Sequence, residues 1–122
     1  MVLVGFQFAD ESGLKYRPAV VLSSRACHRN RQEVIVAAVT SNVRRSFFGD
    51  YLLAGWKESG LLLPSIVTGI LRTIKVQMIH RRLGSVPASE LAAVDENLCK
   101  ILGLRARAQE QGTLTLRKRH EG

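Results

Sequence analysis

The sequence of 122 residues contains little of what defines several large protein classes. Its two cysteines, Cys27 and Cys99, lie in separate segments, which argues against a disulfide framework and against a zinc knuckle. The longest apolar stretch, from Leu61 to Leu71, has 11 residues, whereas a membrane-spanning helix needs about 20. The first residues do not form a basic leader with a cleavage site, so we expect no secretion signal, no membrane partner and a cytoplasmic location.

Common catalytic signatures are missing as well. The sequence has no GxSxG, HExxH, P-loop or dinucleotide-binding pattern, which argues against the familiar hydrolase, metalloprotease and nucleotide-binding classes.

The single Trp, two Tyr and four Phe do not alternate with basic residues along the sequence, so a general RNA-binding barrel is the weakest hypothesis. Positive charge is abundant, because 18 Lys and Arg outnumber 10 Asp and Glu and give a net charge of +8. This balance favours a polyanionic partner such as nucleic acid or an acidic protein segment.

The length and composition predict one packed domain with a basic tail. Hydrophobic residues make up 46% of the chain and charged residues 23%, which are ordinary values for a globular domain. We expect this domain over residues 1–104. Residues 105–122 carry five basic and two acidic side chains, and the sequence leaves open whether this tail is a solvated end or a contact for RNA.

Most of the chain before residue 85 is expected to form short strands and no helix, because apolar and β-branched residues occur in bursts separated by turn residues. The burst Glu33–Thr40 is apolar on both faces, which is typical of a buried central strand. Leu91, Val94 and Leu98 recur at the three- and four-residue spacing of a helix, which predicts one helix that begins near Pro87 and ends at Gly103. The other expected strands are 2–8, 17–23, 50–54, 65–71 and 78–81, and residues 113–116 form either a short edge strand or a disordered segment.

Several polar residues at predicted strand ends are candidates for anion binding. Arg17 precedes Pro18, which favours an extended backbone, so its guanidinium is either an ordinary exposed charge or a grip for two phosphate oxygens. Thr40 and Ser41 end the most hydrophobic strand, and their hydroxyls either cap the following turn or bind a phosphate. Ser65 follows a proline and has the same two interpretations.

Two further groups of charged residues allow two interpretations each. Asp10 and Glu11 lie in a predicted turn, as ordinary turn acids or as carboxylates that reach into a cleft. His80, Arg81 and Arg82 are typical of a solvated basic strand end rather than of a catalytic imidazole.

The order of these segments resembles the MazF/PemK family of toxin–antitoxin endoribonucleases. The resemblance rests on segments 2–10, 15–23 and 36–41, followed by blocks at 60–67, 71–74 and 79–84, and it covers about residues 1–104. It implies a mainly β fold with a C-terminal helix, in the form of a small SH3-like barrel of the MazF/PemK/CcdB type. It also implies a homodimer that cleaves single-stranded RNA, often messenger RNA, without a metal or other cofactor, and a cognate antitoxin as protein partner.

Carried over onto this chain, the resemblance makes Arg17 and Thr40 the catalytic residues. The predicted RNA-binding residues are Ser41, Ser65, Arg72, Asp10 and Glu11. Attack by a ribose 2′-hydroxyl requires a proton acceptor, charge stabilisation and a proton for the leaving oxygen. Arg17 suits charge stabilisation better than proton donation.

The chain departs from the family pattern in one respect. Some relatives have a carboxylate in the strand after the Pro-Ser block, and residues 68–72 here contain no acid, so the general base is unassigned and Asp10 or Glu11 is nearest in order. The missing carboxylate also supports an alternative. In that alternative the same barrel acts without catalysis as a stoichiometric binder, either like the gyrase-poisoning relatives or as a decayed toxin that only holds an antitoxin.

Overall fold

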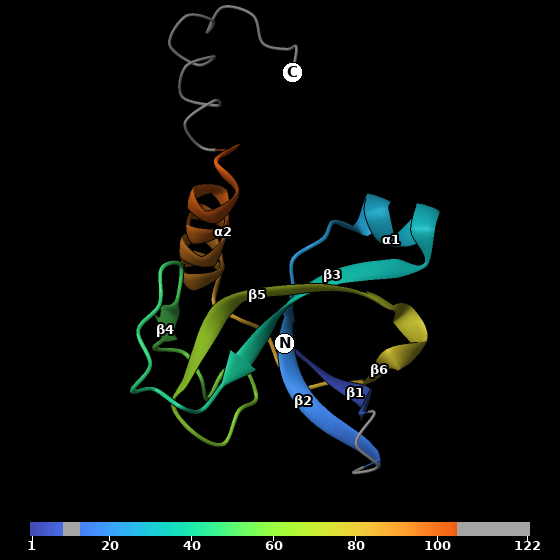
Figure 1. The fold of residues 1–122 in the computed structure, drawn as a ribbon, viewed down its shortest axis with the longest axis horizontal. Coiled ribbons are helices and arrows are strands. Elements are labelled where there is room, and N and C mark those ends of the chain that lie inside the picture. Colours follow the sequence, from blue (N-terminus) through green and yellow to red (C-terminus); the bar gives the residue numbers. More distant parts are fainter. Residues whose placement is uncertain (9–12, 105–122) are drawn as a thin grey trace, which may run out of the picture.

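The fold is a six-stranded antiparallel sheet followed by a C-terminal helix (Figure 1). The computed structural model describes residues 1–8 and 13–104. Strands follow the spatial order β4-β5-β3-β2-β1-β6. The prediction of a mainly β fold with a C-terminal helix is confirmed. The elements are β1 (Val2–Phe8), β2 (Gly13–Val21), α1 (Arg25–Arg31), β3 (Glu33–Thr40), β4 (Tyr51–Leu53), β5 (Ser65–Lys75), the 3-10 helix η1 (Val76–Met78), β6 (Ile79–Arg82) and α2 (Ala88–Leu102).

Strand β3 is central, as its sequence predicts, because it pairs with β2 on one side and with β5 on the other. Its successive residues contribute to two hydrophobic clusters on opposite faces of the sheet. Ala37 and Val39 belong to one cluster, and Val34 and Val36 belong to the other. Ile35 is the exception, since it is 38% exposed.

Contacts between two loops link the opposite ends of the strand order. The segment after β4 approaches the segment after β6, where the amide of Ser85 donates a hydrogen bond to the carbonyl of Glu58 over 3.3 Å. Gly60 has a φ of +87°, and a Cβ there would collide with the carbonyl oxygen of Leu83. Only glycine combines this backbone conformation with this close approach. The sheet therefore curls around a shared core.

Helix α2 is anchored to the sheet by a buried carboxylate. Glu90 accepts hydrogen bonds from the hydroxyl of Tyr51 (2.8 Å) and from the amides of Ala54 (2.7 Å) and Gly55 (2.6 Å). Burial alone would raise the pKa of Glu90, but these three hydrogen bonds outweigh burial and hold the pKa below its ordinary value. The carboxylate is therefore charged at neutral pH and fixes the start of α2 against the end of β4.

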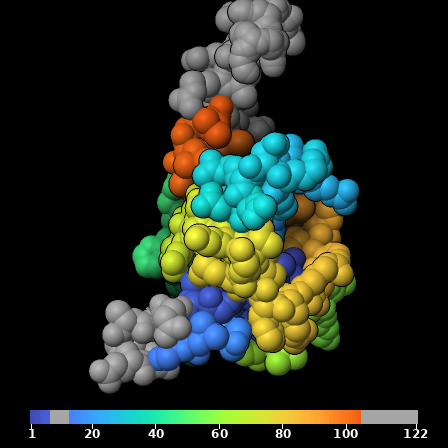
Figure 2. Space-filling model, turned by 90° about the vertical axis from the view of Figure 1, so that its right-hand side faces the viewer, coloured from blue at the N-terminus to red at the C-terminus, as the bar shows by residue number. Residues whose placement is uncertain are grey.

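Helix α1 corrects the expectation that no helix occurs before residue 85. It is short, none of its residues is buried, and it therefore has no apolar stripe that a sequence pattern could detect. Ser24 caps it by accepting a hydrogen bond from the amide of Cys27 over 3.2 Å. The amide of Val76 donates a hydrogen bond to the carbonyl of Gln32, the residue after α1. In Figure 2 the light blue and cyan atoms of α1 accordingly lie beside the yellow atoms of the segment around Val76.

Some boundaries also differ from the expected ones. Strand β2 begins at Gly13 rather than at Arg17, because it pairs with β1 along its first residues. Strand β5 continues to Lys75 rather than ending at Leu71, because it pairs with β3 up to that residue.

No helix in the described part of the chain is long and apolar enough to span a membrane. The basic tail and the segment 113–116 lie outside the described residues.

Candidate functional site

A groove opens where two neighbouring strands separate. Strands β2 and β3 pair only through residues 19–21 and 36–38. Beyond that point β2 continues alongside β1, and β3 continues alongside β5, so the two strands diverge (Figure 1). A groove of about 790 Å³ lies there, lined by residues of β1, β2, β3, β5 and β6 and by the segment 60–63.

Arg17 and Thr40 occupy corresponding positions on the two sides of this split. Ala19 pairs with Ala38, so Arg17 lies two residues before the last pair and Thr40 lies two residues after it. Side chains two apart on a strand share a face, and paired residues also share a face. Both residues line the groove. The structure thus brings the two predicted catalytic residues to one solvent-open groove, and their roles remain predictions.

The Arg17 side chain is exposed, and its Nη1 atom donates a hydrogen bond to the carbonyl of Tyr16 over 3.1 Å. This contact uses one of the five N–H groups of the guanidinium and leaves the others for a bound anion. An exposed guanidinium beside the split between β2 and β3 therefore meets the requirement for paired contacts to phosphate oxygens.

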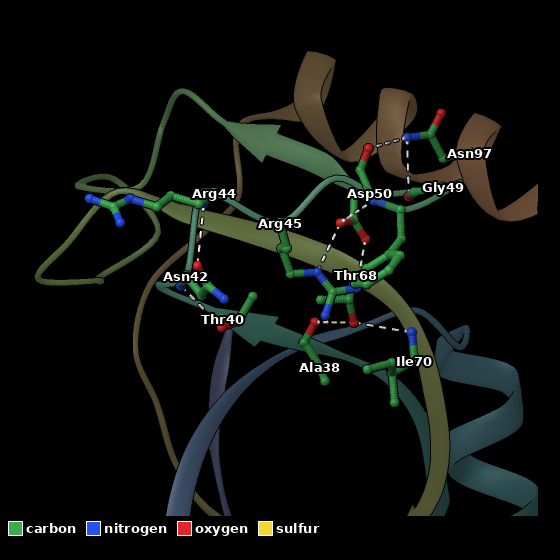
Figure 3. Close-up of polar contacts among 11 residues, drawn as sticks. Ala38, Thr40, Asn42, Arg44, Arg45, Gly49, Asp50, Thr68, Ile70 and Asn97 are labelled. Carbon is green, nitrogen blue, oxygen red and sulfur yellow. Dashed lines mark hydrogen bonds and ion pairs between the residues drawn. The ribbon is translucent and has the colours of Figure 1, made fainter.

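The Thr40 hydroxyl both caps a turn and has a proton to donate. Its Oγ1 atom accepts a hydrogen bond from the amide of Asn42 over 3.1 Å, and Asn42 in turn accepts from the amide of Arg44 (Figure 3). Because Oγ1 acts as acceptor in this turn, the hydroxyl hydrogen can be directed at another acceptor in the groove. Capping and anion binding, the two interpretations of Thr40, are therefore compatible.

A buried threonine lies in an irregular part of β5 opposite the end of β3. The β3–β5 register shifts between Ala37 and Val39. The Thr68 hydroxyl donates to the carbonyl of Ala38 over 2.8 Å and accepts from the amide of Ile70 over 3.0 Å (Figure 3). Thr68 is 4% exposed and opens the acid-free segment 68–72. The extra residues lie on β5, because Ala37 and Val39 are two residues apart whereas their partners Leu71 and Val67 are four apart. The Thr68 hydroxyl ties this bulge to β3 two residues before Thr40.

The groove is basic. Arg72 and Arg81 line it together with Arg17, and the Arg72 guanidinium lies 4.7 Å from the centre of the Phe6 ring. Within residues 1–8 and 13–104 no acid lines the groove, and the ion pairs join other arginines, Arg31 with Glu33 and Arg45 with Asp50. Three guanidinium groups, with no acid in the described lining, concentrate positive potential in a concave site, which attracts a polyanion.

The other predicted RNA-binding residues have different surroundings. Ser41 lines the groove and is exposed. Ser65 also borders the groove, but it is 4% exposed and its hydroxyl donates to the carbonyl of Leu63 over 2.9 Å, the capping role that its sequence context also allowed. Asp10 and Glu11 lie outside the described residues.

Sequence reasoning did not assign Arg81 or Tyr16 to the groove. Arg81 was interpreted as a solvated strand end, but it pairs with Leu3 of β1, and this register carries it to the groove. The signal that could have found it is the pairing of the last strand with the first, which no local pattern specifies. Tyr16 precedes Arg17 and was not considered.

A charged cluster fixes the loop that follows Thr40. The Nε and Nη2 atoms of Arg45 donate to the two carboxylate oxygens of Asp50 over 2.9 and 3.0 Å, and the amide of Phe47 donates to the same carboxylate (Figure 3). Asn97 of α2 donates to the carbonyl of Asp50 over 3.4 Å. The hydrogen bonds from Arg45, joined by that from Phe47, hold the pKa of Asp50 below its ordinary value of 3.8 although burial opposes this.

Asp50→Asn is expected to lower the free energy of unfolding at neutral pH. A carboxylate with a lowered pKa stabilises the fold above its ordinary pKa, and this contribution disappears as the pH falls through the folded-state pKa. The difference between the wild type and Asp50→Asn should therefore shrink below pH 3.8. Urea unfolding over a pH series measures it, with Asp95→Asn on the exposed side of α2 as the control. A difference that stays constant with pH would contradict this account.

Together the fold and the groove define a small antiparallel β protein with a basic site at a split in its sheet. The family model of PemK-like, MazF-like toxins of type II toxin–antitoxin systems matches residues 1–102. The chain therefore belongs to this family of toxins.

Solved structures agree with this assignment. The Mycobacterium tuberculosis toxin MazF-mt6 is 25% identical, with a TM-score of 0.67 over 85% of this chain and 98% of that chain. A MazE-MazF structure from Deinococcus radiodurans is also 25% identical, with a TM-score of 0.70 over 84% of this chain and 91% of the other. An endoribonuclease in complex with its cognate antitoxin, from a mycobacterial species, shares the fold at 18% identity, with a TM-score of 0.65 over 84% of this chain and 92% of the other. A search of curated proteins gives no match.

Proposed function

We propose that the protein is an endoribonuclease that cleaves single-stranded RNA, including messenger RNA, without a metal ion. The observation that carries the proposal is the basic groove that Arg17 and Thr40 both line, from corresponding positions on the two strands that separate there. Membership in the toxin family supports the same function.

The chemistry follows from the groups in the groove. The ribose 2′-hydroxyl attacks the adjacent phosphorus and loses its proton, and the bond from phosphorus to the 5′-oxygen breaks as that oxygen gains a proton. The products are a 2′,3′-cyclic phosphate and a 5′-hydroxyl end. Arg17 stabilises the charge that develops on the phosphate oxygens, and Thr40 donates a hydrogen bond to one of them. Arg72 and Arg81 hold neighbouring phosphates.

The proton acceptor is the open part of this mechanism. Asp10 and Glu11, which lie between β1 and β2 in the sequence, are the proposed candidates, because the described lining of the groove contains neither an acid nor a histidine. No group of three or more His, Cys, Asp and Glu side chains within residues 1–8 and 13–104 could hold a metal.

The proposed partners match the charge of the protein. An antitoxin with an acidic or flexible segment would lie in the same groove and compete with RNA. The MazE-MazF structure and the antitoxin complex among the similar structures support such a partner. We also propose a homodimer and a cytoplasmic location, as the family resemblance implies.

Incubation of the purified protein with mixed single-stranded RNA in excess EDTA tests the function. The expected result is cleavage with cyclic phosphate ends, unchanged in Arg29→Ala, which removes an exposed arginine of α1 outside the groove. Intact RNA in the presence of folded, dimeric protein would overturn the proposal. Tight binding of RNA or antitoxin without cleavage would then favour the stoichiometric binder.

A further inference from the structure

An aromatic ring beside the groove has an unusual setting. Tyr16 of β2 lines the groove and is 43% exposed. Its ring centre lies 4.9 Å from that of His80 on β6, with the two ring planes at 52°. Strand β1 runs between β2 and β6, so these two side chains meet across an intervening strand.

A glycine makes this contact possible. Gly5 of β1 pairs directly with Tyr16, and a Cβ at position 5 would lie 3.1 Å from Cε1 and 3.5 Å from Cδ1 of the tyrosine. A Cβ contact at 3.1 Å is tighter than most Cβ atoms make, and without a Cβ the tyrosine ring lies close to the bare backbone of Gly5. The ring is thereby held between β1 and the tilted ring of His80, while nearly half of the residue faces solvent.

The groove gives this ring a place next to the proposed chemistry. Consecutive residues on a strand point to opposite faces, so Tyr16 and Arg17 diverge. Both nevertheless line the groove, whose β2 lining consists of the four consecutive residues 16–19 and so includes residues of both faces of the strand. A nucleotide whose phosphate contacts Arg17 can therefore place a neighbouring base on the face of the sheet that carries Tyr16.

We propose that the Tyr16 ring, held over Gly5 and against His80, is a stacking surface for an unpaired nucleobase next to the cleaved phosphate. This inference rests on the proposed function, since it assigns the base-binding part of the same groove. Aromatic rings recognise unpaired bases through their faces, and a ring that is already held in place loses little freedom on binding. The described lining holds one other aromatic residue, Phe6, which packs against the hydrophobic core and has the Arg72 guanidinium over its ring. Tyr16 is therefore the aromatic side chain of this lining that is open to a base.

Binding of uncleavable strands tests the proposal. The probes are fluorescently labelled oligo(dA) and oligo(dT) and an abasic deoxyribose-phosphate strand of the same length. The wild type should bind the base-bearing strands more tightly than the abasic strand. Tyr16→Ala should weaken binding of at least one base-bearing strand by about 5- to 150-fold, the range for loss of one stacked base, and should leave abasic binding nearly unchanged.

Two variants serve as controls. Tyr16→Phe keeps the ring and should bind like the wild type, whereas Leu14→Ala removes an exposed apolar side chain from the same face of β2 and should not change the preference for bases. A preference for bases that survives in Tyr16→Ala, or that is absent in the wild type, would overturn the stacking surface. Failure of the wild type to cleave RNA while this preference is present would overturn the nuclease and not the stacking surface.

Discussion

Arg17→Ala is expected to lower the single-turnover rate of RNA cleavage by about 100- to 1000-fold, the usual loss when one preorganised donor to a developing oxyanion is removed. The guanidinium is exposed, and its hydrogen bond within the described chain goes to the carbonyl of Tyr16, so the fold does not depend on it. Stability against urea should therefore stay near that of the wild type. The rate is measured with enzyme in excess over a defined single-stranded RNA.

The conservative variant sharpens this test. Arg17→Lys keeps the positive charge but loses the planar fork that contacts two oxygens, so we expect only partial recovery of the rate. Arg29→Ala, with an exposed arginine on α1, should cleave at the wild-type rate. An Arg17→Ala protein that cleaves within a few-fold of the wild type would show that the phosphate is held elsewhere.

Glu90→Ala is expected to lower the free energy of unfolding by about 3 kcal/mol or more, because each hydrogen bond to a buried charged group contributes about 1.5 to 3 kcal/mol. The substitution removes the acceptor for the hydroxyl of Tyr51 and for the amides of Ala54 and Gly55. These donors lie in the interface of α2 with the sheet and would have no partner there. Urea unfolding monitored by the single tryptophan, Trp56, measures the loss.

Glu90→Gln separates the hydrogen bonds from the charge. Its amide oxygen keeps part of the acceptor capacity, so this variant should lie between the wild type and Glu90→Ala in stability. Asp95→Ala, which removes an exposed carboxylate of the same helix, is the comparison for the loss of an acidic side chain on the helix surface. Equal stability of Glu90→Ala and Asp95→Ala would contradict the anchoring role of Glu90.

The fold could be predicted where the pattern of burial is strong. The two-faced apolar burst of β3 and the helical stripe of α2 identify their elements because both are packed against the core. Helix α1 escaped prediction because it buries nothing and is held by the cap at Ser24 and the turn at Gln32. Its sequence therefore carries no periodic signal.

The candidate site was predictable only in part, for a topological reason. Arg17 and Thr40 were identified from strand ends and from the family resemblance, but their convergence depends on the place where pairing between β2 and β3 stops. Arg81 reaches the groove because the last strand pairs with the first. Tyr16 reaches His80 because Gly5 lies between them. Such long-range pairings are properties of the sheet and leave no trace in local sequence.

A double-mutant cycle on cleavage tests most directly whether the side chains that flank the split act on one phosphate. Single-turnover rates would be measured for Arg17→Ala, for Thr40→Val and for the double variant, with Thr40→Ser as the variant that keeps the hydroxyl. If both groups stabilise the same transition state, the double variant should be far less impaired than the product of the two single losses implies. Independent losses that multiply, or a wild-type rate in Thr40→Val, would contradict a shared site.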